Sequence, residues 1–236
     1  MRARLLATAA VLAVTSALLA AAPAPADPSA VAGAAAAAGR RAGNTEVPVE
    51  GGTARFDAPP ALLAAFKDHG VTVARLDADG RISRQRSTDA GVRLDIEGGA
   101  VSNSGGKVGG ELRFAKTGLA LLNSETGKSV RLSDFVADLS QGALRAGLNH
   151  GRGLTVGTFT RSATKAAVDT DTARLRINVG IKVTAVAAAR LNAALGTKIL
   201  TAGGPLLHAR IDVHLDSSVD LRTALNLSRR PARRED

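Results

Sequence analysis

The chain has 236 residues, 45 % of them hydrophobic and 22 % charged, which is typical of a globular protein. It carries 31 Lys and Arg against 21 Asp and Glu, a formal net charge of +10. It has no Cys, Trp or Tyr, and its one Met is Met1, so thiolate metal sites, iron–sulfur clusters, disulfides and Cys nucleophiles are excluded.

The N-terminal residues have the layout of a secretory signal peptide. Arg2 and Arg4 precede an apolar run over residues 5–22, and Ala24-Pro25-Ala26 provides a small-residue cleavage site. A membrane-spanning helix is the alternative, because the run is close to the lower length limit for one. We expect residues 1–26 to be removed near Ala26, leaving a protein that is secreted or associated with the cell wall and has no transmembrane helix.

Composition divides the remaining chain. Residues 27–50 are rich in Ala, Gly and Pro and lack apolar periodicity, which predicts a flexible linker. A single β-rich domain is expected over residues 51–227. Residues 228–236 are charged and are expected to form a disordered tail.

The domain is dominated by alternation with a period of two. Apolar residues alternate with polar ones over residues 173–183 and 207–215, and shorter stretches begin at Val92, Val108 and Leu144. This pattern is typical of half-buried antiparallel strands. Turn pairs separate the stretches: Asp79-Gly80, Gly98-Gly99, Gly105-Gly106, Thr126-Gly127 and Gln141-Gly142. The predicted fold is mainly β, an antiparallel β-sandwich or open barrel of short hairpin-connected strands.

Two segments interrupt this alternation and predict short helices. Asp57 is expected to cap the first, which Gly70 ends. Thr184 is expected to cap the second, which runs to Leu195 and is ended by Gly196. Both helices are expected to cover the ends of the sandwich.

Histidines are the main candidates for ligand chemistry. His208 and His214 share one face of a predicted strand, and about 3.3 Å per residue separates them by roughly 20 Å. They therefore cannot share a metal ion. Each is either a ligand that acts with partners elsewhere in the fold or a residue that simply faces solvent. His150 lies in a glycine-rich turn that is either a ligand-binding loop or a simple hairpin. No metal site is predicted.

No motif identifies a catalytic residue. The chain lacks a G-x-S-x-G elbow and a phosphate-binding G-x-x-x-x-G-K-[ST] loop. It also lacks the Trp and Tyr platforms of a sugar-cleaving cleft. We therefore expect a protein that is not an enzyme. The least favoured alternative is a hydrolase whose site residues are far apart in the sequence and are brought together by the fold.

The charge pattern predicts a surface for anionic partners. Arg174, Arg176, Lys182 and Arg210 fall on the outward faces of two predicted strands. In a secreted protein we expect them to contact an anionic cell-wall polymer or the envelope surface through weak electrostatic attraction. Nucleic acid is not expected, because no aromatic residues stand among the basic ones.

Three stretches together resemble secreted actinobacterial proteins of the HtaA-like type. They are Gly110-Glu111-Leu112-Arg113-Phe114 with Thr117-Gly118-Leu119, Val130-Arg131-Leu132-Ser133-Asp134-Phe135 with Leu144-Arg145-Ala146, and Ala188-Ala189-Arg190-Leu191-Asn192-Ala193-Ala194-Leu195-Gly196-Thr197 with Thr201-Ala202-Gly203. The resemblance covers residues 52–215.

This resemblance implies a β-rich domain that binds haem at the cell envelope, through a Tyr ligand supported by His. The chain has no Tyr, so that ligand has no counterpart here. A haem or porphyrin carrier that uses His208, His214 or His150 as its ligand is therefore the alternative function.

Overall fold

The structure, a computed structural model, describes residues 45–86, 91–149, 151, 153–160 and 164–227. These residues belong to one compact unit that spans Gly43–Asp236. The expected signal peptide, residues 27–44 of the expected linker and the expected tail lie outside the described residues. None of the helices in the described part of the chain is long and apolar enough to cross a membrane.

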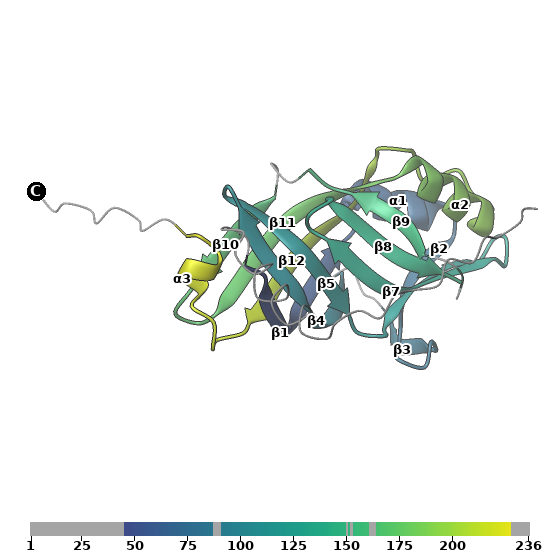
Figure 1. Cartoon of the computed structure of the whole chain (residues 1–236). Helices are drawn as coiled ribbons and strands as arrows, with labels where there is room; N and C mark the ends of the chain where they lie inside the picture. Colours follow the sequence, from purple (N-terminus) through teal and green to yellow (C-terminus); the bar gives the residue numbers. More distant parts are fainter. Residues whose placement is uncertain (1–44, 87–90, 150, 152, 161–163, 228–236) are drawn as a thin grey trace, which may run out of the picture. The chain divides into compact units, whose positions relative to one another are not determined.

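The unit consists mainly of antiparallel strands (Figure 1). The strands are β1 (Val47–Asp57), β2 (Val71–Leu76), β3 (Ile82–Arg86), β4 (Val92–Ser104), β5 (Lys107–Phe114), β6 (Gly118–Asn123), β7 (Ser129–Asp138), β8 (Ala143–Leu148), β9 (Gly153–Thr158), β10 (Lys165–Asp169), β11 (Arg174–Val183) and β12 (Pro205–Leu215). The helices are α1 (Pro60–Asp68), α2 (Ala185–Leu195) and α3 (Leu221–Ala224). β1 begins at Val47, so the folded domain starts earlier than the predicted boundary at residue 51, and residues 47–50 are strand rather than linker.

The strand pairings close into a ring. The order β7-β5-β4-β1-β12-β11-β9-β8 is continuous, and β8 pairs in turn with β7. β6, β2 and β3 extend the sheet from β7, and β10 pairs with β11. The predicted class, a mainly antiparallel β fold of hairpin-connected strands, is confirmed.

Alternation along the strands places the core inside this ring. In β11, Leu175, Ile177 and Val179 are buried, whereas Arg176 and Asn178 are exposed between them. The buried apolar residues of the ring strands form one main cluster. The period-two pattern in the sequence therefore identified the inward face of this strand correctly.

Glycines allow the ring strands to bend. Gly98 and Gly99, predicted as a turn, instead lie inside β4 beside a register shift, and that prediction was wrong. A Cβ on Gly99 would collide with the carbonyl oxygen of Glu111, and one on Gly52 would collide with the carbonyl oxygen of Asp212. The backbones approach too closely for a side chain here, so these glycines permit curvature rather than a chain reversal.

A bulge in β7 reverses the alternation at one point. Ser133 and Asp134 both lie outside the core, Asp134 has φ +51°, and the register against β8 shifts between Ser133 and Val136. Phe135, which strict alternation from Leu132 would turn outward, is consequently buried.

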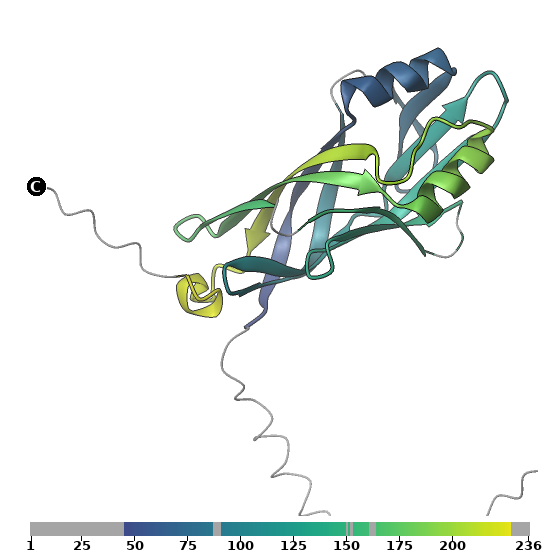
Figure 2. The same cartoon turned by 90° about the horizontal axis from the view of Figure 1, so that it is seen from above.

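The two predicted helices exist, but one begins differently. Asp57 is the last residue of β1, and α1 begins at Pro60 after Pro59, which forms no side-chain cap. For α2 the prediction is confirmed: the Thr184 hydroxyl accepts a hydrogen bond from the Ala187 N–H, and Gly196 ends the helix with φ +68°. Figure 2 shows α1 and α2 at one end of the strands and the unpredicted α3 at the other.

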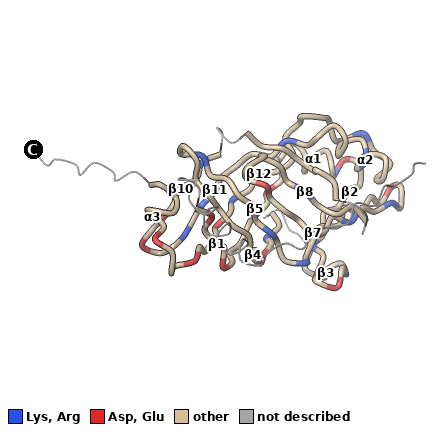
Figure 3. The backbone as a smooth tube through the Cα atoms, in the orientation of Figure 1, with Lys and Arg blue, Asp and Glu red and all other residues tan. Residues whose placement is uncertain are grey.

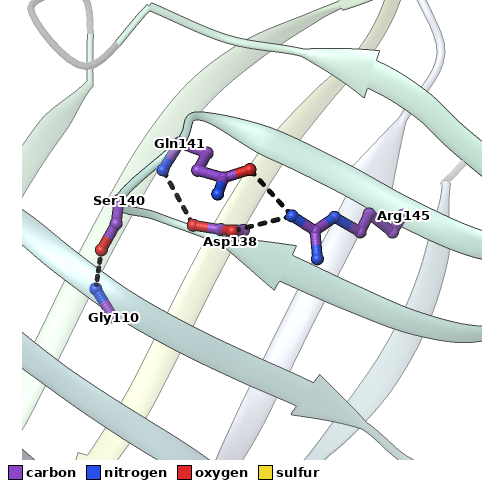
Figure 4. Close-up of polar contacts among 5 residues, drawn as sticks. All are labelled: Gly110, Asp138, Ser140, Gln141 and Arg145. Carbon is purple, nitrogen blue, oxygen red and sulfur yellow. Dashed lines mark hydrogen bonds and ion pairs between the residues drawn. The ribbon is translucent and has the colours of Figure 1, made fainter. Parts of the chain in front are cut away.

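A small polar network lies where β5, β7 and β8 meet (Figure 4). The buried Asp138 carboxylate accepts hydrogen bonds from the Gln141 N–H (2.8 Å) and from Nη2 of Arg145 (3.0 Å). Nη2 of Arg145 also donates to Oε1 of Gln141 (2.8 Å), and the Gly110 N–H donates to Oγ of Ser140 (2.7 Å). The network links the turn between β7 and β8 to the neighbouring strand β5.

We expect Asp138→Ala to lower the free energy of unfolding by about 2 kcal/mol, because it leaves a donor of the turn and the Arg145 guanidinium without their acceptor. Urea unfolding followed by circular dichroism measures the change. Asp95→Ala removes an exposed carboxylate from β4 and is the matched control, with an expected change below about 0.5 kcal/mol. Equal effects of the two substitutions would show that the Asp138 network does not stabilise the junction.

Candidate functional site

A cavity of about 510 Å³ lies between α1 and the end of the strand ring. Its lining includes the end of β1 and the starts of β4 and β12, and the volume is in the range of small-molecule sites. Most of its lining is apolar, from Phe56, Ala58, Leu62, Leu63, Ala64, Phe66, Gly70, Val71, Val73, Gly91, Val92, Leu119, Leu121, Leu132, Phe135, Val156, Leu191, Leu200, Leu206 and Leu207. The exposed residues Ala64, Lys67 and Thr72 mark its mouth.

Aromatic rings form part of the cavity wall. Phe56, Phe66 and Phe135 line it, three of the five Phe in the chain. The rings of Phe56 and Phe135 are stacked, with centroids 6.4 Å apart and planes at 27°. Such rings offer a ligand a large rigid apolar surface. The bulge in β7 therefore contributes to the site, because it turns Phe135 inward.

Helix α2 forms a wall that polar side chains hold in place. Nδ2 of Asn123 and the Thr126 hydroxyl both donate to the carbonyl oxygen of Leu195, at 3.0 and 2.9 Å. The Asn192 amide donates to the Leu200 carbonyl (2.8 Å) and accepts from the Leu200 N–H (3.0 Å). These bonds fix Leu200 in the cavity wall.

Helix α1 forms the opposite wall by apolar contact. Phe66 is its one fully buried residue, while Leu62 and Leu63 are half-buried and face the cavity. Among the described residues, α1 has no side-chain hydrogen bond to the strands. Phe66 and Leu62 also pack against the main core, so the apolar side of the helix is shared between packed side chains and the cavity.

The polar groups that line the cavity are Asp57, Lys67, Thr72 and Ser124. Nε of Arg55 donates to Asp57 (2.9 Å), and Nη2 of Arg210 donates to its other oxygen (2.7 Å). Partial burial raises the pKa of Asp57, but the hydrogen bonds from Arg210 and Arg55 and their charges outweigh it and hold the pKa below its ordinary value. The Ser124 hydroxyl donates to the Gly70 carbonyl (3.1 Å).

The predicted basic residues lie on the outward face of β11 and β12, and acids lie among them. Figure 3 shows basic and acidic positions interspersed along the backbone of the domain. Arg174 and Arg176 are 3.9 and 3.8 Å from Asp212, and Arg210 pairs with Asp57. Lys182 is exposed and has no ion pair among the residues that the structure describes. The four cations thus share one face, which carries both signs of charge.

Neither of the described candidate histidines is among the residues that line the cavity. His208 and His214 are exposed on the outward face of β12. His150 falls outside the described residues. The cavity lining contains no His and none of the other usual axial ligands of haem, Met, Cys or Tyr, so the described residues do not provide a haem ligand there. The described residues also hold no group of three His, Cys, Asp or Glu suited to a metal ion.

The cavity is not visible in the sequence. Its residues come from eleven separate segments, and within each segment the apolar ones cannot be told from ordinary core residues. The one available signal was the small Phe inventory, since most of these rings gather at the site.

The Asp57 pairs predict a pH dependence. A carboxyl whose pKa is lower in the folded state stabilises the fold above its unfolded pKa, and this contribution is lost as the pH falls through the folded pKa. We expect wild type to have a higher free energy of unfolding than Asp57→Asn at neutral pH. This gap in free energy should narrow below about pH 4. Chemical denaturation of both proteins across pH 2–7 measures it; a gap independent of pH would contradict the assignment.

Comparison with known proteins supports the fold. No family model and no curated protein matches the chain. Among solved structures, it is similar to the C-terminal domain of HtaA from Corynebacterium glutamicum, with TM-score 0.52 and 11 % identity over 72 % of this chain and 99 % of that domain. A domain-swapped dimer of a variant of that domain also matches, with TM-score 0.34 and 10 % identity over 84 % and 99 %. The chain thus has an HtaA-like fold, as the sequence resemblance predicted.

Proposed function

We propose that this domain is a non-catalytic binding protein that carries one apolar small molecule in the cavity between α1 and the strand ring. The observation that carries the proposal is the cavity itself, about 510 Å³ lined by Phe and Leu side chains with a few polar groups at one side. Preformed apolar pockets with few polar groups are typical of small-molecule sites.

The polar groups of the cavity suit orientation of a ligand rather than a reaction on it. The Asp57 carboxylate is occupied by two arginines, and Ser124 donates to a backbone carbonyl. A serine nucleophile needs an adjacent base, and none of the described histidines lines the cavity. With the signal peptide that the sequence predicts, the protein would act outside the membrane, where a carrier keeps an apolar molecule in solution.

A blocking substitution tests the proposal. Val73 is half-buried and lines the cavity, so Val73→Trp is expected to fill part of it. We expect the full chain to bind N-phenyl-1-naphthylamine, a neutral apolar fluorophore, and Val73→Trp to weaken this binding at least tenfold. Fluorescence titration measures it.

Leu122→Trp is the matched control. Leu122 is also half-buried and lies on β6 next to Leu121, but it packs against the separate small cluster that contains Leu76. We expect this variant to bind the fluorophore as wild type does. No binding by wild type, or equal loss in both variants with the fold retained, would overturn the proposal.

A second candidate function is contact with an anionic cell-wall polymer. The observation in its favour is that Arg176, Lys182 and Arg210 are exposed on neighbouring strands of one face. We expect cosedimentation with purified cell walls at low salt, weakened by the double substitution Arg176→Glu and Lys182→Glu and abolished in 1 M salt, where the Debye length is about 3 Å. The double substitution Arg113→Glu and Arg131→Glu, at exposed positions of β5 and β7, changes the net charge by the same amount and is the control. Binding that is independent of salt would remove this candidate.

A further inference from the structure

Of the charged side chains that line the cavity, one has no partner among the described residues. Lys67 lies in the last turn of α1, is exposed, and lines the cavity. It forms no ion pair with any residue that the structure describes. The other charged lining residue, Asp57, is paired with both Arg55 and Arg210. Among the lining side chains, the unpaired charge available to a ligand is therefore positive, while the exposed side chain of Glu125 lies beside Gly70 of the lining.

Among the described lining residues, the interior beyond Lys67 offers no unpaired charged side chain to receive a second charge. The other polar lining side chains are the hydroxyls of Thr72 and Ser124, and Ser124 is bonded to the Gly70 carbonyl. An ionic group placed among the Phe and Leu side chains would lose its hydration without compensation. A ligand that fits both regions has an apolar body and one charged end.

We propose that the cavity binds an anionic amphiphile, an apolar chain that ends in one carboxylate or phosphate, with its head group on the Lys67 ammonium. This inference rests on the proposed function and names the ligand class of the same site. The apolar chain of the ligand lies against Phe56, Phe135 and the leucines, and its charged head group remains at the water-exposed mouth. An ion pair at the edge of an apolar wall is stronger than one in open water, because less solvent screens it.

The mouth is also clear of both ends of the described chain. β1 runs from Val47 to Asp57, about 35 Å at 3.3 Å per residue, and it is Asp57 that lines the cavity. Leu227 lines a separate small pocket with Val101, the residue paired with Val47. Figure 2 shows the corresponding separation of α1 and α3. The chain therefore enters and leaves the described domain far from the mouth.

A simple structural role for Lys67 gives a different expectation. A cation in the last turn of a helix is stabilised by the helix dipole whether or not a ligand binds. In that case Lys67→Gln changes stability slightly and leaves ligand preference unchanged. The two roles are therefore separated by binding measurements with ligands of different head groups.

The test uses the full protein and four single-chain probes, the three ionic ones below their micellar concentrations and the alcohol below its solubility limit. They are dodecanoate, dodecyl phosphate, dodecanol and dodecyltrimethylammonium, titrated by calorimetry. We expect both anions to bind at least tenfold more tightly than dodecanol, with the cation weakest. Comparison of the two anions identifies carboxylate or phosphate as the preferred head. Lengthening the better anion by one methylene is expected to tighten binding about fourfold until the cavity is full.

Substitution of Lys67 completes the test. We expect Lys67→Gln to weaken binding of the better anion about tenfold and to leave dodecanol unchanged, and Lys67→Arg to restore most of the anion affinity. Lys116→Gln, at an exposed residue that does not line the cavity, is the matched control and is expected to bind as wild type does. Equal binding of anion and alcohol, or an unchanged Lys67→Gln, would overturn the head-group inference while leaving the proposed function standing. Failure of all four probes and of the neutral fluorophore would overturn the proposed function itself.

Discussion

Closure of the strand ring is the constraint on which the rest of this structure depends. β7 pairs with β5 along one edge and with β8 along the other, and this double pairing joins the two ends of the strand order. In a closed ring every strand has a neighbour on both sides, and here the β11–β9 joint consists of the pairs Lys182 with Thr158 and Val183 with Gly157. The inward side chains form the main core, and the cavity opens at one end of the ring.

Closure in turn requires local departures from regular strand geometry. Gly52 and Gly99 let neighbouring backbones approach, and the bulge at Ser133 and Asp134 changes which side chain of β7 faces inward. The same bulge places Phe135 beside Phe56. The features that bend the sheet thus also shape the wall of the cavity, so the geometry of the site follows from that of the ring.

Local sequence patterns predicted the strands and α2 well, because burial on one face imposes a period that can be seen within ten residues. The pattern over residues 173–183 corresponds to β11, and Thr184 with Gly196 bounds α2. Local patterns gave the wrong structure at two places, where contacts distant in the sequence matter. Gly98 and Gly99 form no turn but lie in β4, close to the backbone of Glu111. Asp57 caps no helix but ends β1, where Arg210 donates a hydrogen bond to it. The cavity was not predictable in this way, because Leu62, Leu121 and Leu200 become neighbours only after the ring closes.

The contrast between the two helices at the cavity has a mechanical consequence. α2 is fastened by amide and hydroxyl groups to the turn after β6, so displacing it would break several directional bonds. α1 is held by side-chain burial, which is non-directional and tolerates sliding. α2 is therefore the more rigid wall of the cavity and α1 the less rigid one. Ligands of different widths would be accommodated by displacement of α1 rather than of α2.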